Sequence, residues 1–134
     1  MLNEEDVDLY AWITNTRDGS GTAGVAYLGG ACDNGAWQKT SINSGPTLNA
    51  AGGILSIAYT MSHEIGHNLG MKHDHVGSNA NNLRVHNGQK CHGLMAYGQH
   101  PNVWSPCSVA DFKAHYTYWM DSWCMPGIDS FLAF

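Results

Sequence analysis

The sequence is poor in charged residues. Only 13% of its 134 residues are charged, and the six Lys and Arg residues are scattered singly. Nucleic-acid-binding domains and membrane-surface anchors depend on clustered basic residues, so neither a nucleic acid nor a membrane surface is an expected partner. No apolar run approaches the ~18 residues of a membrane-spanning helix. The residues after Met1 are acidic and give no signal peptide, so a secreted protein would be represented here by a mature fragment or an incomplete sequence.

The sequence also lacks a C-x-x-C pair, the spacing typical of a structural zinc ribbon. Its four cysteines are Cys32, Cys91, Cys107 and Cys124. An even number without that spacing favours two disulfides and an oxidising compartment, with buried reduced cysteines as the alternative. The spacing does not choose among the alternative pairings.

One segment, Met61 to His73, concentrates the chemistry of the chain. It reads M-S-H-E-I-G-H-N-L-G-M-K-H. His63 and His67 are four residues apart, so on a helix their imidazoles lie on one face and can reach the same metal ion. Glu64 follows the first histidine and suits the role of a general base beside a metal-bound water.

The rest of this segment predicts a third ligand. Gly70 stands where a helix would end in the left-handed conformation that glycine adopts at little cost, and His73 could then turn back towards the metal. Three histidine ligands and one open position describe a catalytic zinc site, because structural sites are usually closed by four protein ligands. The whole pattern is H-E-x-x-H-x-x-G-x-x-H, a metzincin motif. The fixed offsets disfavour the alternative, a helix that merely carries histidines.

Apolar spacing predicts the elements around this segment. A helix from about Leu48 to Asn68 would carry the first two histidines, and Val7 to Thr14, Val25 to Leu28 and Lys39 to Ile42 are expected strands. The first of these could also be the end of a helix that runs into a strand. The second is bounded by glycines, so it could be an edge that pairs with an extended peptide or an ordinary short core strand.

The C-terminal half is expected to be irregular and rich in loops. The Asn-rich stretch from Gly77 to Asn87 has the composition of a surface loop. A second helix is predicted from Val109 to Met120, with Ser108 as its N-cap. The tail from Ile128 to Phe134 is expected to be poorly ordered unless it packs on something. Residues 1–134 therefore predict a single α+β domain in which a long helix lies against a small mixed sheet.

From Val25 to Cys124 the chain resembles the adamalysin/reprolysin branch of the metzincin proteases, the catalytic domains of the ADAMs and of snake-venom metalloproteinases. The matching segments are G-V-A-Y-L-G-G-A-C (Gly24 to Cys32), H-E-I-G-H-N-L-G-M-K-H-D (His63 to Asp74) and W-S-P-C-S (Trp104 to Ser108). Asp74, after the third histidine, is the residue that this branch has at that position.

The resemblance implies an α/β sandwich-like metzincin fold and a secreted or extracellular zinc endopeptidase that cleaves proteins or peptides. It implies His63, His67 and His73 as ligands of one catalytic Zn²⁺ and Glu64 as the catalytic base. Met95 would lie in the Met-turn beneath the zinc. A calcium site occurs in relatives, but no ligand set for Ca²⁺ can be mapped onto this sequence.

The resemblance also implies how substrate would bind. The edge strand that pairs antiparallel with substrate maps onto Gly24 to Gly30, and so includes Gly24, Val25, Ala26, Tyr27, Leu28 and Gly29. Gly98 to Trp104 would form the wall of the pocket for the side chain after the scissile bond. The implied disulfides are Cys32–Cys124 and Cys91–Cys107, each worth roughly 3 to 5 kcal/mol in the chain-entropy model.

The sequence departs from this branch in three ways. It is shorter, without the first strands and helix of the catalytic domain. Gly93 stands where a cysteine is usual, so one common loop disulfide is absent. Tyr97 gives M-A-Y, as in astacins and serralysins, where that tyrosine resembles a switchable metal ligand or oxyanion donor. A packed turn aromatic is the alternative for Tyr97.

Several residues and functions stay open at this point. Asp74 could cap a local turn, but we hypothesise that it bonds local backbone and orients the Met-turn. Two other functions remain, a metal-binding or adhesion domain without activity and a structural module held by disulfides. The oligomeric state is not set by the sequence. The remaining histidines are interpreted as surface residues: His75, His86, His92, His100 and His115.

Overall fold

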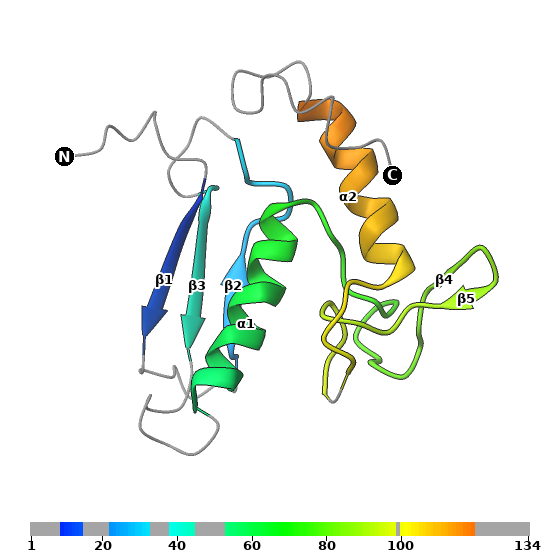
Figure 1. Cartoon of the computed structure of the whole chain (residues 1–134), viewed down its shortest axis with the longest axis horizontal. Coiled ribbons are helices and arrows are strands. Elements are labelled where there is room, and N and C mark those ends of the chain that lie inside the picture. Colours follow the sequence, from blue (N-terminus) through cyan, green and yellow to red (C-terminus); the bar gives the residue numbers. More distant parts are fainter. Residues whose placement is uncertain (1–8, 15–21, 33–37, 45–52, 99, 120–134) are drawn as a thin grey trace.

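The computed structural model describes residues 9–14, 22–32, 38–44, 53–98 and 100–119. Two helices and two small sheets occupy these residues (Figure 1), and they form the predicted α+β fold. The elements in chain order are β1 (Tyr10–Thr14), β2 (Gly24–Ala26), β3 (Thr40–Ser44), α1 (Gly53–Asn68), β4 (Val85–His86), β5 (Gln89–Lys90) and α2 (Pro106–Trp119).

The larger sheet is mixed, with β3 between β1 and β2. β3 pairs in parallel with β1, so that Tyr10 lies opposite Thr40, and antiparallel with β2, so that Gly24 lies opposite Asn43. Among the described strands, β2 therefore has a neighbour on one side and lies at an edge of the sheet. The sequence allowed this glycine-bounded strand to be either an edge strand or a short core strand, and the described sheet has it at an edge.

β2 is shorter than the sequence predicts. Tyr27 and Leu28 lie beyond its end, because the chain turns at Gly29, where φ is +70°. The N–H of Gly29 donates to the carbonyl of His67 at 2.7 Å. The turn thus attaches the end of β2 to the last turn of α1.

α1 packs against β3 and β2 (Figure 1). Within β3, Ser41 and Asn43 are fully buried while Ile42 is 45% exposed, as expected when alternate side chains face the helix and the opposite side. The predicted helix start near Leu48 lies outside the described residues.

α1 ends as the motif predicts. Gly70 has φ +85° and its N–H donates to the carbonyl of His67 at 2.9 Å, while the N–H of Met71 donates to that of Gly66 at 2.9 Å. These two bonds define the Schellman motif, in which a left-handed glycine satisfies the last carbonyls of a helix. The prediction for Gly70 is confirmed.

α2 begins earlier than predicted, because its N-cap is Ser105 and not Ser108. The hydroxyl oxygen of Ser105 accepts from the N–H of Ser108 at 3.1 Å, and its carbonyl accepts from Val109 at 3.0 Å. Pro106 then takes the first helical position, where its fixed φ fits and its missing N–H has no helical partner to lose. Further along α2, Phe112 and Tyr116 pack into a small core.

The Asn-rich stretch from Gly77 to Asn87 was predicted to be a surface loop, but part of it forms paired strands. His75 forms an isolated bridge with Leu83, and β4 and β5 make a hairpin. Its two turn residues, Asn87 and Gly88, have φ of 49° and 78°. Positive φ at both positions is typical of the tight hairpin turn that Asn-Gly favours.

A disulfide joins Cys91 to Cys107, as the resemblance implies, with their Cα atoms 5.7 Å apart. It attaches the segment after the hairpin to the first turn of α2. Cys32 is also disulfide-bonded. Its expected partner Cys124, and the tail from Ile128, lie outside the described residues.

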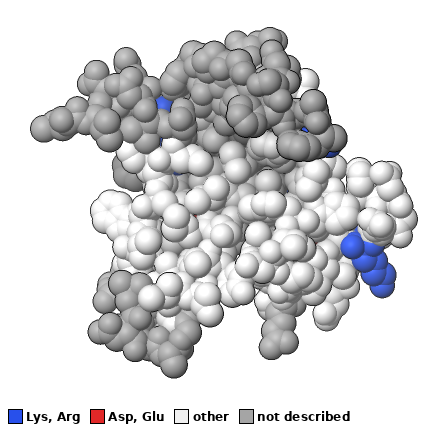
Figure 2. Space-filling view, viewed as in Figure 1, with Lys and Arg blue, Asp and Glu red and all other residues white. Residues whose placement is uncertain are grey.

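The described surface in Figure 2 is largely uncharged, in keeping with the composition. Lys and Arg side chains stand apart from one another on this face. Neither of the described helices is long and apolar enough to span a membrane.

Candidate metal centre

Three imidazoles converge at the C-terminal end of α1. His63 and His67 lie one turn apart on the helix, and His73 approaches from the segment after Gly70. One nitrogen of each ring lies within 4.8 Å of the other two, and the Nε2 atoms of His67 and His73 are 3.1 Å apart. Zinc binds imidazole nitrogen at about 2.0–2.1 Å, so one ion fits between such atoms.

Backbone carbonyls orient the first two rings. Nδ1 of His63 donates to the carbonyl of Leu94 at 2.7 Å, and Nδ1 of His67 donates to that of Met71 at 2.8 Å. A carbonyl only accepts, so Nδ1 carries the proton in each ring. The lone pair is left on Nε2, the arrangement typical of histidines that bind a metal.

Burial keeps these imidazoles neutral. Desolvation, which is the largest cause, and the neighbouring His67 and His100 together lower the pKa of His63 to about 4, although its hydrogen bond to Leu94 opposes them. The same two causes lower the pKa of His73 to about 4. Desolvation also lowers the pKa of His67. A metal ion requires the neutral form of its histidine ligands, so the three residues fit a zinc ion in charge as well as in position.

Glu64 lies beside the three rings and is only 6% exposed. Desolvation raises the pKa of its carboxyl group to about 7. The backbone of β2 passes close to this carboxyl group. A Cβ added to Gly24 would lie only 2.5 Å from Oε1 of Glu64. A carboxyl group with a pKa near neutrality can both accept and return a proton.

A cleft of about 1150 Å³ lies over the imidazoles and Glu64. Residues 22–26, which include β2, form part of its lining, and Tyr97, Gly98 and His100 form another part. The imidazoles and Glu64 therefore border a space that solvent can enter. Of the predicted pocket wall, Gly98 and His100 line the cleft, Gln99 lies outside the described residues, and Trp104 packs near Gly66.

Met95 is fully buried close to α1. A Cβ on Gly66, the residue before His67, would lie 2.5 Å from its Sδ atom, so glycine there gives the thioether room against the helix. The neighbouring carbonyl of Leu94 is the one that orients His63. The Met95 segment therefore supports the centre through packing and through a hydrogen bond.

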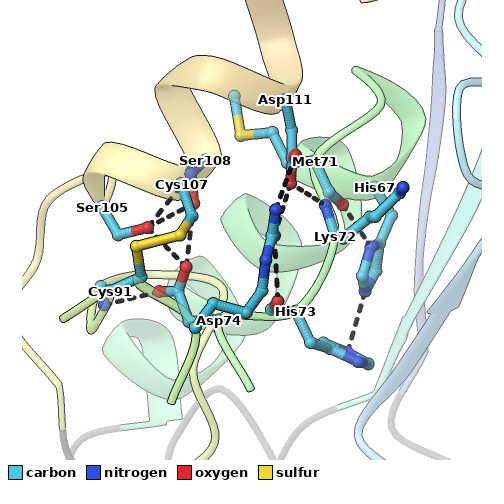
Figure 3. A network of polar contacts seen from close by, with 12 residues as sticks. His67, Met71, Lys72, His73, Asp74, Cys91, Ser105, Cys107, Ser108 and Asp111 are labelled. Carbon is cyan, nitrogen blue, oxygen red and sulfur yellow. Dashed lines mark hydrogen bonds and ion pairs between the residues drawn. A yellow bond between two sulfur atoms is a disulfide. The ribbon is translucent and has the colours of Figure 1, made fainter. Parts of the chain in front are cut away.

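Asp74 holds this segment in place (Figure 3). Its buried carboxylate accepts hydrogen bonds from the N–H of Gly93 at 2.7 Å and from the hydroxyls of Ser105 and Ser108. Its own N–H donates to the carbonyl of Met95 at 2.9 Å. These bonds match the hypothesis that Asp74 orients the Met-turn, although its carboxylate reaches distant segments and not the local backbone.

Tyr97 stands at the cleft and is 53% exposed. Its ring centroid lies 5.9 Å from that of His63 and 4.7 Å from that of His73. Desolvation and the nearby charge of Glu64 raise its pKa. The phenol therefore keeps its proton at neutral pH and can donate a hydrogen bond.

His75 contradicts the prediction that it lies on the surface. It is only 7% exposed, because the bridge to Leu83 and the rings of His73 and Tyr97 surround it. His115 is half-buried and packs against Gly29 and Gly70. The other three histidines differ in exposure, with His92 exposed and His86 and His100 partly exposed.

The model of metallo-peptidase family M12B, reprolysin-like, matches residues 1–116. The chain belongs to this family.

Two relatives of this reprolysin-like chain are snake venom metalloproteinases. It is 31% identical over 118 residues to metalloproteinase TM-1 of Protobothrops mucrosquamatus, an alignment that covers 87% of the chain and 52% of that relative. It is 35% identical over 74 residues to trimerelysin-2 of Protobothrops flavoviridis, with 55% of the chain and 34% of that relative covered. The alignments thus cover about half the length of the first relative and about a third of the second.

The fold of this reprolysin-like chain brings most of the predicted site residues to one cleft. His63, Glu64, His67 and His73 line it together with Gly24 to Ala26 and Tyr97. Leu28 borders a smaller adjoining hollow of about 250 Å³. Sequence reasoning missed the roles of Gly66 and Ser105, and it misplaced His75. The only signal for His75 was its position two residues after the third predicted ligand.

Proposed function

We propose that this chain carries the catalytic centre of a zinc-dependent endopeptidase. The observation that carries the proposal is the convergence of three neutral imidazoles and one protonatable carboxyl group in a single open cleft. Membership of the reprolysin-like metallopeptidases supports it. A purely structural metal site would need a fourth protein ligand and would have no use for Glu64.

The three histidines would hold the ion through the nitrogens that face one another. Bound zinc supplies Lewis acidity, which makes a water molecule easier to deprotonate and stabilises negative charge on a carbonyl oxygen. Glu64 accepts the proton of the attacking water and returns it to the nitrogen of the leaving amine. Its buried position and its raised pKa suit both steps.

The substrate backbone would add to the sheet beside β2. An extended peptide that pairs with an edge strand gains main-chain hydrogen bonds whatever its side chains are. Gly24 brings the β2 backbone against Glu64, so a peptide held there has its carbonyl close to the general base. This arrangement favours protein or peptide substrates in an extended conformation.

Tyr97 would assist on the other side of the cleft. Its protonated phenol lies over two of the predicted ligands and is accessible to substrate. A donor placed where negative charge develops stabilises the transition state more than the substrate. Tyr97 is therefore assigned to hydrogen bonding of the carbonyl oxygen as it becomes negative, in preference to simple packing.

The disulfide between Cys91 and Cys107 supports a secreted or extracellular location. Disulfides persist in oxidising compartments and are rare in the cytosol. Extracellular proteins are accordingly the proposed substrates.

The test is peptide cleavage by the purified zinc-loaded protein, compared with the same protein after treatment with a chelator. Cleavage should stop on chelation and return when zinc is restored. Glu64→Gln should keep its zinc and lose activity by about 10²-fold or more. Wild-type protein that binds zinc stoichiometrically but cleaves no peptide would instead favour a metal-binding domain without activity.

A further inference from the structure

The third predicted ligand is oriented differently from the other two. Nδ1 of His63 and Nδ1 of His67 each donate to a backbone carbonyl. Among the described residues, no hydrogen bond reaches Nδ1 of His73, whose Nε2 faces His67. A ligand ring without such a bond can rotate, so something else must fix its plane.

His75 supplies a surface for that ring. The two imidazoles are stacked, with centroids 4.9 Å apart and planes inclined by only 11°. Tyr97 contacts both, and its centroid lies 4.7 Å from that of each. The three rings form one cluster in which the plane of His73 is set by aromatic packing.

His75 is itself held rigidly. Its Nδ1 donates to the carbonyl of Gly77 at 2.9 Å, and its backbone bridges to Leu83. It is 7% exposed, and its Nε2 has no hydrogen-bond partner among the described residues. Burying an unpaired ring nitrogen costs free energy that an apolar residue would avoid. What His75 supplies here is a flat ring that stacks on His73, and its hydrogen bond to Gly77 adds to the packing that holds this ring in place.

We propose that His75 is a positioning residue that fixes the ring plane of His73, and with it the direction in which His73 would bind the metal. It does for the third ligand what the carbonyls of Leu94 and Met71 do for the first two. The same contact limits the rotation of Tyr97. This inference rests on the zinc centre of the proposed function but not on peptide cleavage.

The experiment measures zinc affinity by competition with a chromophoric chelator, in two variants that separate the ring from its hydrogen bond. His75→Asn keeps a donor for the carbonyl of Gly77 and removes the ring, and should weaken zinc binding by about 10- to 100-fold. His75→Phe keeps a flat ring and should bind zinc within a few-fold of wild type. His92→Ala removes an exposed histidine elsewhere and should bind like wild type.

The absorption spectrum of the cobalt-substituted protein provides a readout that general destabilisation does not change. His75→Asn should alter the ligand-field bands, and His75→Phe should retain them. In a His73→Ala background, His75→Asn should have no further effect on zinc affinity, because the ligand through which it acts is gone. Circular dichroism of the metal-free variants checks that they fold, and His75→Leu replaces His75→Asn if the latter does not.

The inference would be overturned if His75→Asn had wild-type zinc affinity and an unchanged cobalt spectrum. It would also be overturned if His75→Asn weakened zinc binding as much in the His73→Ala background as it does in the wild type. Either result would leave the proposed function standing if the wild type cleaves peptides. A wild-type protein that binds no zinc would overturn both.

Discussion

The buried carboxylate of Asp74 accepts a hydrogen bond from the backbone N–H of Gly93 across 2.7 Å. Asp74 directly follows the third predicted ligand, and Gly93 directly precedes Leu94, whose carbonyl orients the first. One bond thus connects the segment that carries His73 to the segment that supports His63. The geometry of the centre depends on residues that face away from the cleft.

Replacing Asp74 with Asn tests this connection. The Asn side chain keeps one acceptor oxygen, but its NH₂ group replaces the second oxygen and would face the N–H of Gly93 or the hydroxyls of the two serines, which are donors themselves. We therefore expect a loss of roughly 3 kcal/mol in the free energy of unfolding. Urea unfolding of the metal-free protein measures it. Ser105→Ala removes one donor and a helix cap but keeps the carboxylate, and should cost less. Equal stability of Asp74→Asn and wild type would contradict the assignment.

The left-handed glycine at the end of α1 gives a second prediction. Gly70→Ala should lose about 1–2 kcal/mol of stability from the positive φ alone. It should lose more because its Cβ would lie within 3 Å of the His115 ring and Cβ. Gly88→Ala is the matched control, since Gly88 has a similar φ of 78° and open space around it. If both variants lose the same stability in urea unfolding, contact with His115 is unimportant.

The ion pair between Arg84 and Asp111 predicts a dependence on pH. Burial by itself would raise the pKa of Asp111, but hydrogen bonds from Arg84 at 2.6 and 2.8 Å and from the N–H of Lys72 outweigh it and lower that pKa below 3.8. The unfolded chain then takes up its proton at a higher pH than the folded one. The stabilisation is full above the unfolded pKa and is lost as the pH falls through the folded pKa.

Asp111→Asn isolates this contribution. It should destabilise the protein by about 1–3 kcal/mol at neutral pH. The difference between wild type and variant should shrink as the pH falls from about 5 towards about 3. Urea unfolding of both proteins across that range measures it, and a constant difference would mean that the ionised carboxylate contributes nothing.

A substitution at Tyr97 can distinguish a role in hydrogen bonding from a role in packing. Tyr97→Phe keeps the ring that contacts His63, His73 and His75 and removes only the hydroxyl. If the phenol stabilises the transition state, kcat should fall by about 10²-fold while KM and zinc affinity stay near wild type. Steady-state peptide cleavage checks this. Unchanged kcat would return Tyr97 to the role of a packed aromatic.

Much of the centre could be predicted because its signals are local. The spacing of His63 and His67 needs only a helix, and Gly70 needs only a left-handed residue at its end. Both statements concern residues within one or two helical turns. The period of the apolar residues likewise placed α1 and the three strands of the larger sheet, with errors at their ends.

The features that were missed depend on distant partners. Ser105 and Ser108 are equally good caps by residue type, and the following proline and the carboxylate of Asp74 decide between them. The burial of His75 depends on Tyr97 and Leu83, which only the tertiary fold brings together. The hairpin at Asn87 is different, since Asn-Gly is a local signal that was overlooked.

The three predicted ligands come from one short stretch of chain, His63 to His73, and about half of this stretch belongs to α1, which ends at Asn68. A site assembled from distant segments disappears on unfolding, but this stretch keeps its histidines close together even when the sheet and α2 are lost. If the centre binds zinc as proposed, we expect the unfolded chain to retain some affinity for it, and the metal should then raise the free energy of unfolding by less than its affinity for the native protein would give.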